Sequence, residues 1–126
     1  MRIIDNERVI NVAEIIIDGI QYVPKHNLAE EEGMKYCIVR TYSAGVFAGY
    51  IESRDGQEVV IREARRIWSW KGAASLSQLA MSGTSRPQEC KFPEEVDRLT
   101  VTQAIEILEC TEKARMSIKE VPIWKA

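Results

Sequence analysis

Two hydrophobic periods divide the chain, and the first lies near the N-terminus. Apolar side chains recur there at spacings of three and four, at Val9, Ala13, Ile16, Ile17 and Ile20. This is the period of one face of an α-helix, and Asp5 or Asn6 can cap its start. We predict a helix over Asp5–Ile20, packed either on its own sheet alone or also on a second subunit, and then an acidic linker at His26–Gly33.

Beyond the linker the apolar period changes to two, which indicates β-strands. The segments Lys35–Thr41 and Val46–Ser53 are rich in aromatic and β-branched residues, and the short connection Tyr42–Gly45 predicts that they pair antiparallel. An Asp-Gly dipeptide within Arg54–Gln57 is typical of a tight hairpin turn. The next strand is therefore expected at Glu58–Ile61.

The extended pattern continues over Glu63–Trp70. One straight strand through both segments would be unusually long, so we predict a bend or β-bulge near Arg62–Ala64. The segment Ser75–Met81 then has the apolar spacing of a short helix. A polar loop follows at Thr84–Phe92 and leads into the last third of the chain.

The last third contains two further strands and a helix. Alternating residues predict the strands at Val96–Thr102 and Ala104–Glu109. Thr111 can cap a final helix over Glu112–Lys119. The tail Val121–Trp124 is then expected to lie on the fold.

These elements combine into one α+β domain with an N-terminal helix, a small antiparallel β-sheet or half-open barrel, and two short helices. The length of 126 residues fits a single domain. Within it we expect the N-terminal helix and linker over 1–33 and a sheet-based ligand-binding core over 34–126. The apolar share of 45% and the charged share of 29% are ordinary for a globular protein.

The chain has no overall basic charge that would hold an anionic polymer or membrane. It contains 17 Lys and Arg against 19 Asp and Glu, a net charge of −2. We therefore expect no nucleic-acid polymer and no membrane as partner, and an anion needs a local site. No apolar run has the roughly 20 residues of a membrane span. The N-terminus is too charged for a signal peptide, so a cytosolic protein is expected.

Catalytic and metal chemistry has few candidates. Cys37, Cys90 and Cys110 are widely spaced and form no CxxC pair, so we expect free thiols in a reducing compartment. His26 is the one histidine of the sequence, and its place in the linker favours a solvated residue over a catalytic base. No catalytic residue, metal or cofactor is therefore predicted.

The densest group of candidate binding residues lies in Arg62–Lys71. If this segment is extended, alternation puts Arg66, Trp68 and Trp70 on one face and Arg65 on the other. A guanidinium group forms bidentate hydrogen bonds to phosphate oxygens. Stacking of a base on an aromatic ring contributes about 1 to 3 kcal/mol to binding. These four side chains are candidate ligand-binding residues of a nucleotide pocket. The alternative places the tryptophans in the core and the arginines at a solvated edge.

A second candidate lies between the first two predicted strands of the sheet. Arg40, Tyr42, Ser43, Ala44 and Gly45 supply a cation, hydroxyls and a small-residue turn that lets a ligand approach the backbone. Such a loop can bind phosphate or ribose. It lacks the spacing of a P-loop and of a dinucleotide fingerprint, so a plain hairpin loop is the alternative.

The final helix adds Arg115 as a third candidate. Lys119 lies four residues later on the same helical face, so the two cations can meet one phosphate. Two cations also suit the negative end of a helix dipole, which is the structural alternative. Because no candidate base accompanies these residues, the predicted pocket binds and releases its ligand without cleaving it.

Four strings of the sequence resemble a family of small phage-borne proteins. They are VRTYSAGV at Val39–Val46, EARRIWSWKGAA at Glu63–Ala74, LSQLA at Leu76–Ala80 and AIEILECTE at Ala104–Glu112. This family includes the first type of anti-Thoeris protein, which is known as a signal sponge. The similarity runs from about Tyr36 to Trp124, and the N-terminal segment matches less clearly.

The resemblance implies a phage counter-defence protein in the cytoplasm of the infected bacterial host. Such a protein captures a cyclic ADP-ribose isomer made by a TIR-domain enzyme and holds it intact, so that Thoeris signalling is blocked. The resemblance also implies homodimers or higher homo-oligomers with ligand sites at subunit contacts. Some members of the family hold cyclic oligonucleotides as well.

Two other classes of function stay open. A protein-binding inhibitor would dock on a host enzyme through the apolar helix at Val9–Ile20 and would ignore nucleotides. A cyclic-nucleotide phosphodiesterase would use the same arginines to orient phosphate for attack by water, and it would turn the signal over. A sponge holds the ligand intact, a phosphodiesterase cleaves it, and a protein-binding inhibitor does not retain it.

Overall fold

The structure is a computed structural model that describes residues 2–5, 8–11, 15–17, 20–22 and 27–126. Its N-terminal part contains two antiparallel pairs: β1 (Arg2–Asp5) with β2 (Arg8–Asn11), and β3 (Ile15–Ile17) with β4 (Ile20–Tyr22). The described residues within Asp5–Ile20 are therefore strands where we predict a helix, and the rest of that range lies outside the described residues. Isoleucine and valine dominate this segment, and their β-branched side chains favour strands.

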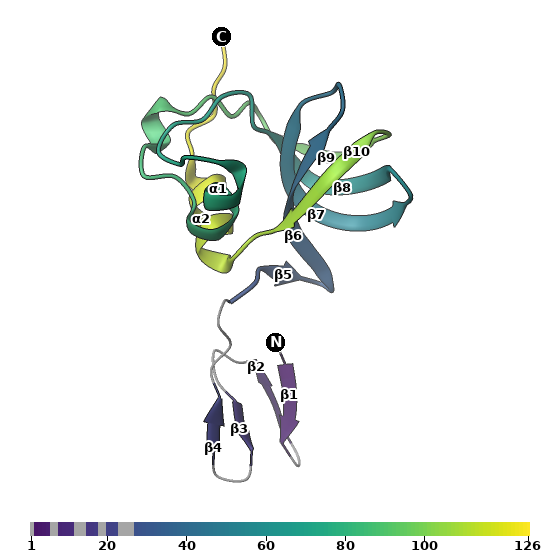
Figure 1. Cartoon of the computed structure of the whole chain (residues 1–126), viewed down its shortest axis with the longest axis vertical. Helices are drawn as coiled ribbons and strands as arrows, with labels where there is room; N and C mark the ends of the chain where they lie inside the picture. Colours follow the sequence, from purple (N-terminus) through teal and green to yellow (C-terminus); the bar gives the residue numbers. More distant parts are fainter. Residues whose placement is uncertain (1, 6–7, 12–14, 18–19, 23–26) are drawn as a thin grey trace.

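An open antiparallel sheet with the order β10-β6-β7-β8-β9 forms the body of the fold, and β5 pairs with β6 beside it (Figure 1). The strands are β5 (Glu30–Glu31), β6 (Met34–Thr41), β7 (Val46–Asp55), β8 (Glu58–Arg66), β9 (Val96–Val101) and β10 (Ala104–Glu109). The predicted α+β class with an antiparallel sheet is confirmed. β8 ends at Arg66, however, and not at Trp70 as predicted.

The two outer strands of the sheet come together at one end. Thr102 and Gln103 alone connect β9 to β10, although these strands lie at opposite ends of the strand order. Main-chain hydrogen bonds hold this connection in place: Ala104 N–H donates to Gln57 O over 3.0 Å, and Tyr42 N–H donates to Gln103 O over 2.9 Å. The sheet is therefore open but curled.

The curled sheet separates two apolar cores, because successive side chains of a strand point to opposite faces. One face packs against α1 (Leu76–Ser82) and α2 (Glu112–Glu120) (Figure 1). The short 3-10 helix η1 (Pro87–Glu89) lies in the connection between α1 and β9. The other face buries a smaller cluster inside the curl, formed by Val39, Phe47, Val59, Ile61, Ala64, Val101 and Ala104.

Both α-helices begin at a side-chain cap, and the cap at Thr111 is the one that the sequence predicts. Ser75 Oγ accepts a hydrogen bond from Gln78 N–H, and Thr111 Oγ1 accepts one from Ala114 N–H. These bonds satisfy backbone donors that have no partner within the first helical turn. Within the described residues, no helix combines the length and apolar character needed to cross a bilayer.

A β-bulge interrupts β8 where the sequence predicts an irregularity. Tyr50 of β7 pairs with Arg62, whereas Ala48 pairs with Arg65, so β8 carries one residue more than β7 over this stretch. Glu63 has a φ of 51°, in the left-handed region that side chains other than glycine rarely adopt. The predicted bulge is therefore confirmed.

The bulge decides which of two adjacent arginines is buried. Before it, Ile61 faces the inside of the curl, and after it Ala64 does, so the alternation has moved by one residue. Arg65 consequently points toward the helices. Arg66 points to the other face, where its guanidinium carbon lies 4.4 Å from the centre of the Phe47 ring. Without the extra residue, the two arginines would exchange faces.

Gly49 of β7 lies opposite the bulge and leaves no room for a side chain. A Cβ there would lie 2.5 Å from Ile61 Cγ2 and 2.7 Å from Arg62 O. We expect Gly49→Ala to lower the free energy of unfolding by about 2 kcal/mol, in the range typical of overpacking, in a urea titration followed by circular dichroism.

Gly33→Asn is the matched control for this substitution. Gly33 has a φ of 79°, and no neighbouring atom lies within 4 Å of a Cβ built on it. Asparagine tolerates this backbone conformation, so the control should unfold within about 0.5 kcal/mol of the wild type. A Gly49→Ala protein as stable as the control would contradict the packing described for the bulge.

Candidate functional site

The predicted binding residues between the first two strands form a braced loop, Tyr42–Gly45, between β6 and β7. Thr41 Oγ1 accepts a hydrogen bond from Ala44 N–H over 2.9 Å and donates one to Gly45 O over 2.7 Å. Ser43 Oγ donates a hydrogen bond to Oε1 of Gln103, in the connection between β9 and β10, over 2.8 Å. Gly45 has a φ of 103°, which explains a glycine at this position. Tyr42, in contrast, stays 78% exposed and is open to a ligand.

Arg66, from the predicted binding segment Arg62–Lys71, contacts this loop. Its Nη1 donates a hydrogen bond to Ala44 O over 2.6 Å, while the guanidinium group lies over the Phe47 ring. A guanidinium group has five N–H donors, and among the described residues only Ala44 takes one from Arg66. The cation is thus held in place, and its other donors are open to an anion.

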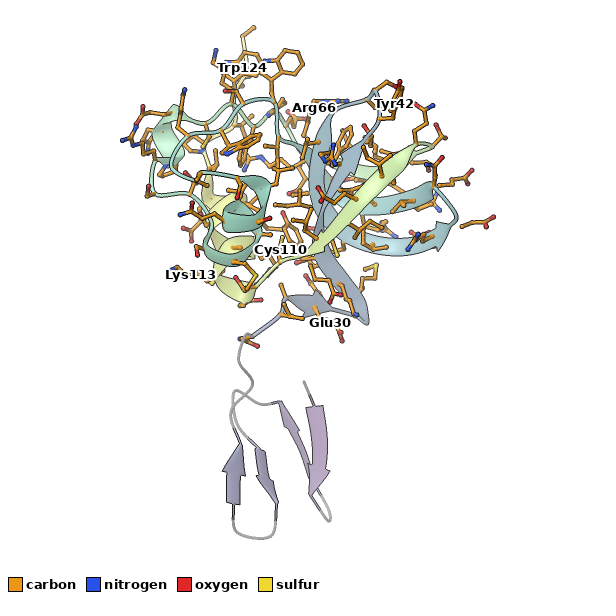
Figure 2. The ribbon with its side chains drawn as sticks, viewed as in Figure 1. Glu30, Tyr42, Arg66, Cys110, Lys113 and Trp124 are labelled. Atoms are coloured by element: carbon orange, nitrogen blue, oxygen red, sulfur yellow. The ribbon has the colours of Figure 1, made fainter. Side chains whose placement is uncertain are left out.

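Two tryptophans lie at the surface beyond the end of β8. Trp68 is 64% exposed and Trp124 is 44% exposed, and their ring centroids are 6.3 Å apart with planes inclined by 16°. Lys91 Nζ lies 5.5 Å from the centre of the Trp124 ring. Figure 2 shows Trp124, Arg66 and Tyr42 along the same end of the molecule. We call Tyr42, Arg66, Trp68, Lys91 and Trp124 the aromatic–cation surface.

Trp70 does not belong to this surface. It is half-buried against the core on the helix side, and its indole Nε1 donates a hydrogen bond to Ala73 O over 3.1 Å. The predicted face that Trp70 would share with Trp68 does not form, because β8 ends before both residues. Sequence reasoning missed Lys91 and Trp124, which lie far from Trp68 in the chain and carry no local signal of this proximity.

Arg65 is also separate from the aromatic–cation surface. It is 3% exposed, and its guanidinium group donates hydrogen bonds of 2.6 to 3.4 Å to the carbonyls of Phe92, Pro93, Ile118, Lys119 and Val121. These carbonyls belong to the segment before β9, the end of α2 and the C-terminal tail. Because its donors are occupied by backbone, Arg65 is a structural residue, which corrects its prediction as a ligand contact.

Arg40 and Arg115 are paired with carboxylates of their own chain. Arg40 Nε donates to Glu106 Oε1 over 3.0 Å in an exposed ion pair. Arg115 binds both carboxylate oxygens of Glu112 and donates to Tyr50 Oη over 3.0 Å. The Glu112 carboxylate raises the pKa of Arg115 above its ordinary value. Tyr50 is four residues beyond the start of β7, about 13 Å at the rise of a strand, so Arg115 lies away from the loop.

The described residues offer little for thiol or metal chemistry. Cys37, Cys90 and Cys110 are free and buried, as predicted for the thiols. Burial raises the pKa of the Cys37 and Cys110 thiols to about 12. Within this part of the chain, no group of three or more His, Cys, Asp or Glu side chains is placed to hold a metal ion. His26 lies outside the described residues.

The fold and the site define an α+β domain that presents aromatic rings and cations at one end of a curled sheet. A family model described as a domain of unknown function (DUF6948) matches residues 34–118, more than half of the chain, and the protein belongs to this family. No curated protein and no solved structure matches it. The matched region contains the braced loop, Arg66, Trp68 and Lys91, and it ends before Trp124.

Replacement of Arg65 should leave several buried carbonyls without a donor. We expect Arg65→Ala to lower the free energy of unfolding by about 3 kcal/mol or more, because each unsatisfied buried polar group costs about 1 to 3 kcal/mol. Arg65→Lys should lose most of the same amount, since an ammonium group lacks the planar fork of donors. Both values can be measured by urea titration.

Arg66→Ala is the matched control for the Arg65 variants. It removes an adjacent guanidinium group that makes one hydrogen bond to the described protein, so its effect should be about 1 kcal/mol or less. If Arg65→Ala were as mild as Arg66→Ala, the structural role of Arg65 would be refuted.

Burial and raised pKa values predict that the Cys37 and Cys110 thiols are protected in the folded protein. At pH 8, both thiols are protonated because their pKa of about 12 lies well above this pH. The thiolate is the reactive form, so an aromatic disulfide reagent should modify neither residue until urea unfolds the protein. Mass spectrometry of the digested protein assigns the modified cysteines. Rapid modification of either residue in the native protein would contradict this burial.

Proposed function

We propose that the protein binds a small phosphorylated nucleotide of the cyclic ADP-ribose type and sequesters it without cleaving it. The observation that carries this proposal is that Arg66 is bound to the braced loop while the ring of Trp68, two residues later, is exposed. Arg66 Nη1 is fixed to Ala44 O, and Trp68 follows two residues later with an exposed ring. A cation held at the loop and an exposed aromatic ring therefore lie two residues apart in the chain.

The chemistry of this surface suits a nucleotide. Arg66 retains guanidinium donors for phosphate oxygens, and charge-assisted hydrogen bonds of this kind are stronger than neutral ones. Trp68 offers a flat ring for a base, while the exposed Tyr42 hydroxyl can bond a ribose or phosphate oxygen. The net charge of −2 makes this local group more important, because the whole chain provides no attraction for an anion.

The same residues favour capture over turnover. Arg66 and Lys91 are cations, and Trp68 and Trp124 are rings, so they bind and orient a ligand. A hydrolytic enzyme also needs a group that takes a proton from water near neutral pH, and none of these side chains is suited to that task. We therefore propose a sponge, in agreement with the resemblance of the Val39–Val46 and Glu63–Ala74 strings to the phage family.

The exposure of the surface supports a homo-oligomer as the binding form. Small-molecule sites usually cover 70 to 90% of their ligand, roughly, whereas Tyr42 and Trp68 are largely exposed in the single chain. Tight capture would thus need a second cover over the ligand. We propose that another copy of the chain supplies this cover, so that the ligand lies at a subunit contact. Capture there removes the signal molecule from solution, and Thoeris signalling is blocked.

A capture assay tests this function. The protein is incubated with a cyclic ADP-ribose isomer, separated from free ligand by filtration and heated, and the released compound is identified by mass spectrometry. We expect intact ligand, whose affinity falls about tenfold or more in Arg66→Ala and in Trp68→Ala, because each removes one direct interaction.

Arg86→Ala is the matched control, since Arg86 is an exposed arginine whose neighbour is Glu89. It should capture the ligand as well as the wild type. Release of a cleaved product would replace the sponge with a phosphodiesterase. No retention at all would eliminate the nucleotide proposal and favour the protein-binding inhibitor.

A further inference from the structure

Bridges between backbone segments position the two exposed tryptophans. Trp68 lies within the residues matched by the family model, and Trp124 lies beyond them. Three short segments lie side by side beyond the sheet: one contains Trp68, the middle one contains Lys91, and the third contains Trp124. Ser69 and Lys91 form an antiparallel bridge, and Trp68 N–H donates to Lys91 O over 3.1 Å. The first segment is therefore fixed to the middle one.

The C-terminal tail is fixed to the other side of the middle segment. Phe92 and Ile123 form a parallel bridge, and Trp124 N–H donates to Phe92 O over 3.0 Å. Arg65 holds the start of the tail through its 2.6 Å hydrogen bond to Val121 O. Both tryptophans thus stand on backbone that is bonded on either side of Lys91 and Phe92.

The two indole rings are stacked on one another with an offset. Their centroids are 6.3 Å apart and their planes differ by 16°. This distance lies within the roughly 4.5 to 7 Å found for ring pairs that stack with an offset, so the two faces already lie parallel, as the two sides of a base-binding site must. A base enters when the two rings part, and both side chains lie at the surface, where rotation is fast.

A cation accompanies this pair of rings. Lys91 Nζ lies 5.5 Å from the centre of the Trp124 ring, and the Lys91 backbone lies between the two tryptophan segments. A planar ring that enters between the indoles would therefore meet a positive charge beside it. This combination suits a base that carries a phosphate, and it does not suit an apolar ring alone.

We propose that Trp68 and Trp124 form a clamp for the base of a purine nucleotide, with Lys91 beside its phosphate. The clamp rests on the function proposed above for the assignment of the ligand class, and it adds the C-terminal tail to the site. Purines are favoured over pyrimidines because the larger ring system covers more of both indoles. Trp124 becomes the residue that distinguishes a nucleotide from a phosphate without a base.

The test compares two probes, adenosine monophosphate and ribose 5-phosphate, by isothermal titration with tryptophan fluorescence as a second readout. The wild type should bind adenosine monophosphate about tenfold more tightly than ribose 5-phosphate, with quenching by the former alone. Trp124→Ala should lose about tenfold in affinity for adenosine monophosphate and keep its affinity for ribose 5-phosphate. Trp124→Phe preserves a flat ring and should recover most of the loss.

Met116→Ala is the matched control, because Met116 is an exposed apolar residue of α2 and lies outside the aromatic–cation surface. Circular dichroism and the thermal midpoint establish that each variant folds. The clamp is overturned if adenosine monophosphate does not bind, if Trp124→Ala binds it as the wild type does, or if the variant loses both probes equally. A change of oligomeric state in Trp124→Ala without a change in affinity would assign the rings to a subunit contact and would also overturn it.

These outcomes are distinct from a failure of the sponge function. Binding of adenosine monophosphate that depends on Trp124, without capture of a cyclic ADP-ribose isomer, would support the clamp and refute the sponge. Capture of the cyclic compound by Trp124→Ala at wild-type affinity would support the sponge and refute the clamp.

Discussion

Arg65 joins the sheet, the last helix and the C-terminal tail. The final carbonyls of a helix have no partner one turn further along the helix. In α2 the Arg65 guanidinium donates to two of them, Ile118 O and Lys119 O, and the N–H of the C-cap residue Val121 also donates to Ile118 O over 3.3 Å. Its positive charge also lies at the negative end of the helix dipole. The same group donates to Phe92 O and Val121 O, so one side chain binds backbone carbonyls of several irregular segments.

The bulge at Glu63 makes this arrangement possible. It moves the alternation of β8 by one residue, so that Arg65 faces the helices and Arg66 faces the curl of the sheet. Lys119 stabilises the bulge from the helix side, where its Nζ lies 2.7 Å from Glu63 Oε1. A single local irregularity therefore sets both the central structural contact and the position of the cation beside the braced loop.

Local sequence patterns predict much of the fold, but they do not predict which side chains contact one another in the candidate site. The Asp-Gly turn forms as its sequence indicates, with Asp55 paired to Glu58 and a φ of 61° at Gly56. The length of the strand also indicated the bulge, yet a sequence cannot say which residue is the extra one, and this alone decides between Arg65 and Arg66. The contact of Trp68 with Trp124 depends on bridges between segments distant in the chain, for which no periodicity exists.

Structural and surface residues alternate within one short string, and this limits what a shared motif says about a ligand. In the string from Arg65 to Trp70, Arg65 and Trp70 serve the interior, while Arg66 and Trp68 face the surface. A resemblance across the whole string therefore reflects the demands of folding as much as those of binding. Because Arg65 holds the tail three residues before Trp124, loss of Arg65 would also displace a ring of the surface without any contact to a ligand. Substitutions at Arg66, Trp68 and Trp124, whose side chains lie outside the core, separate recognition from stability.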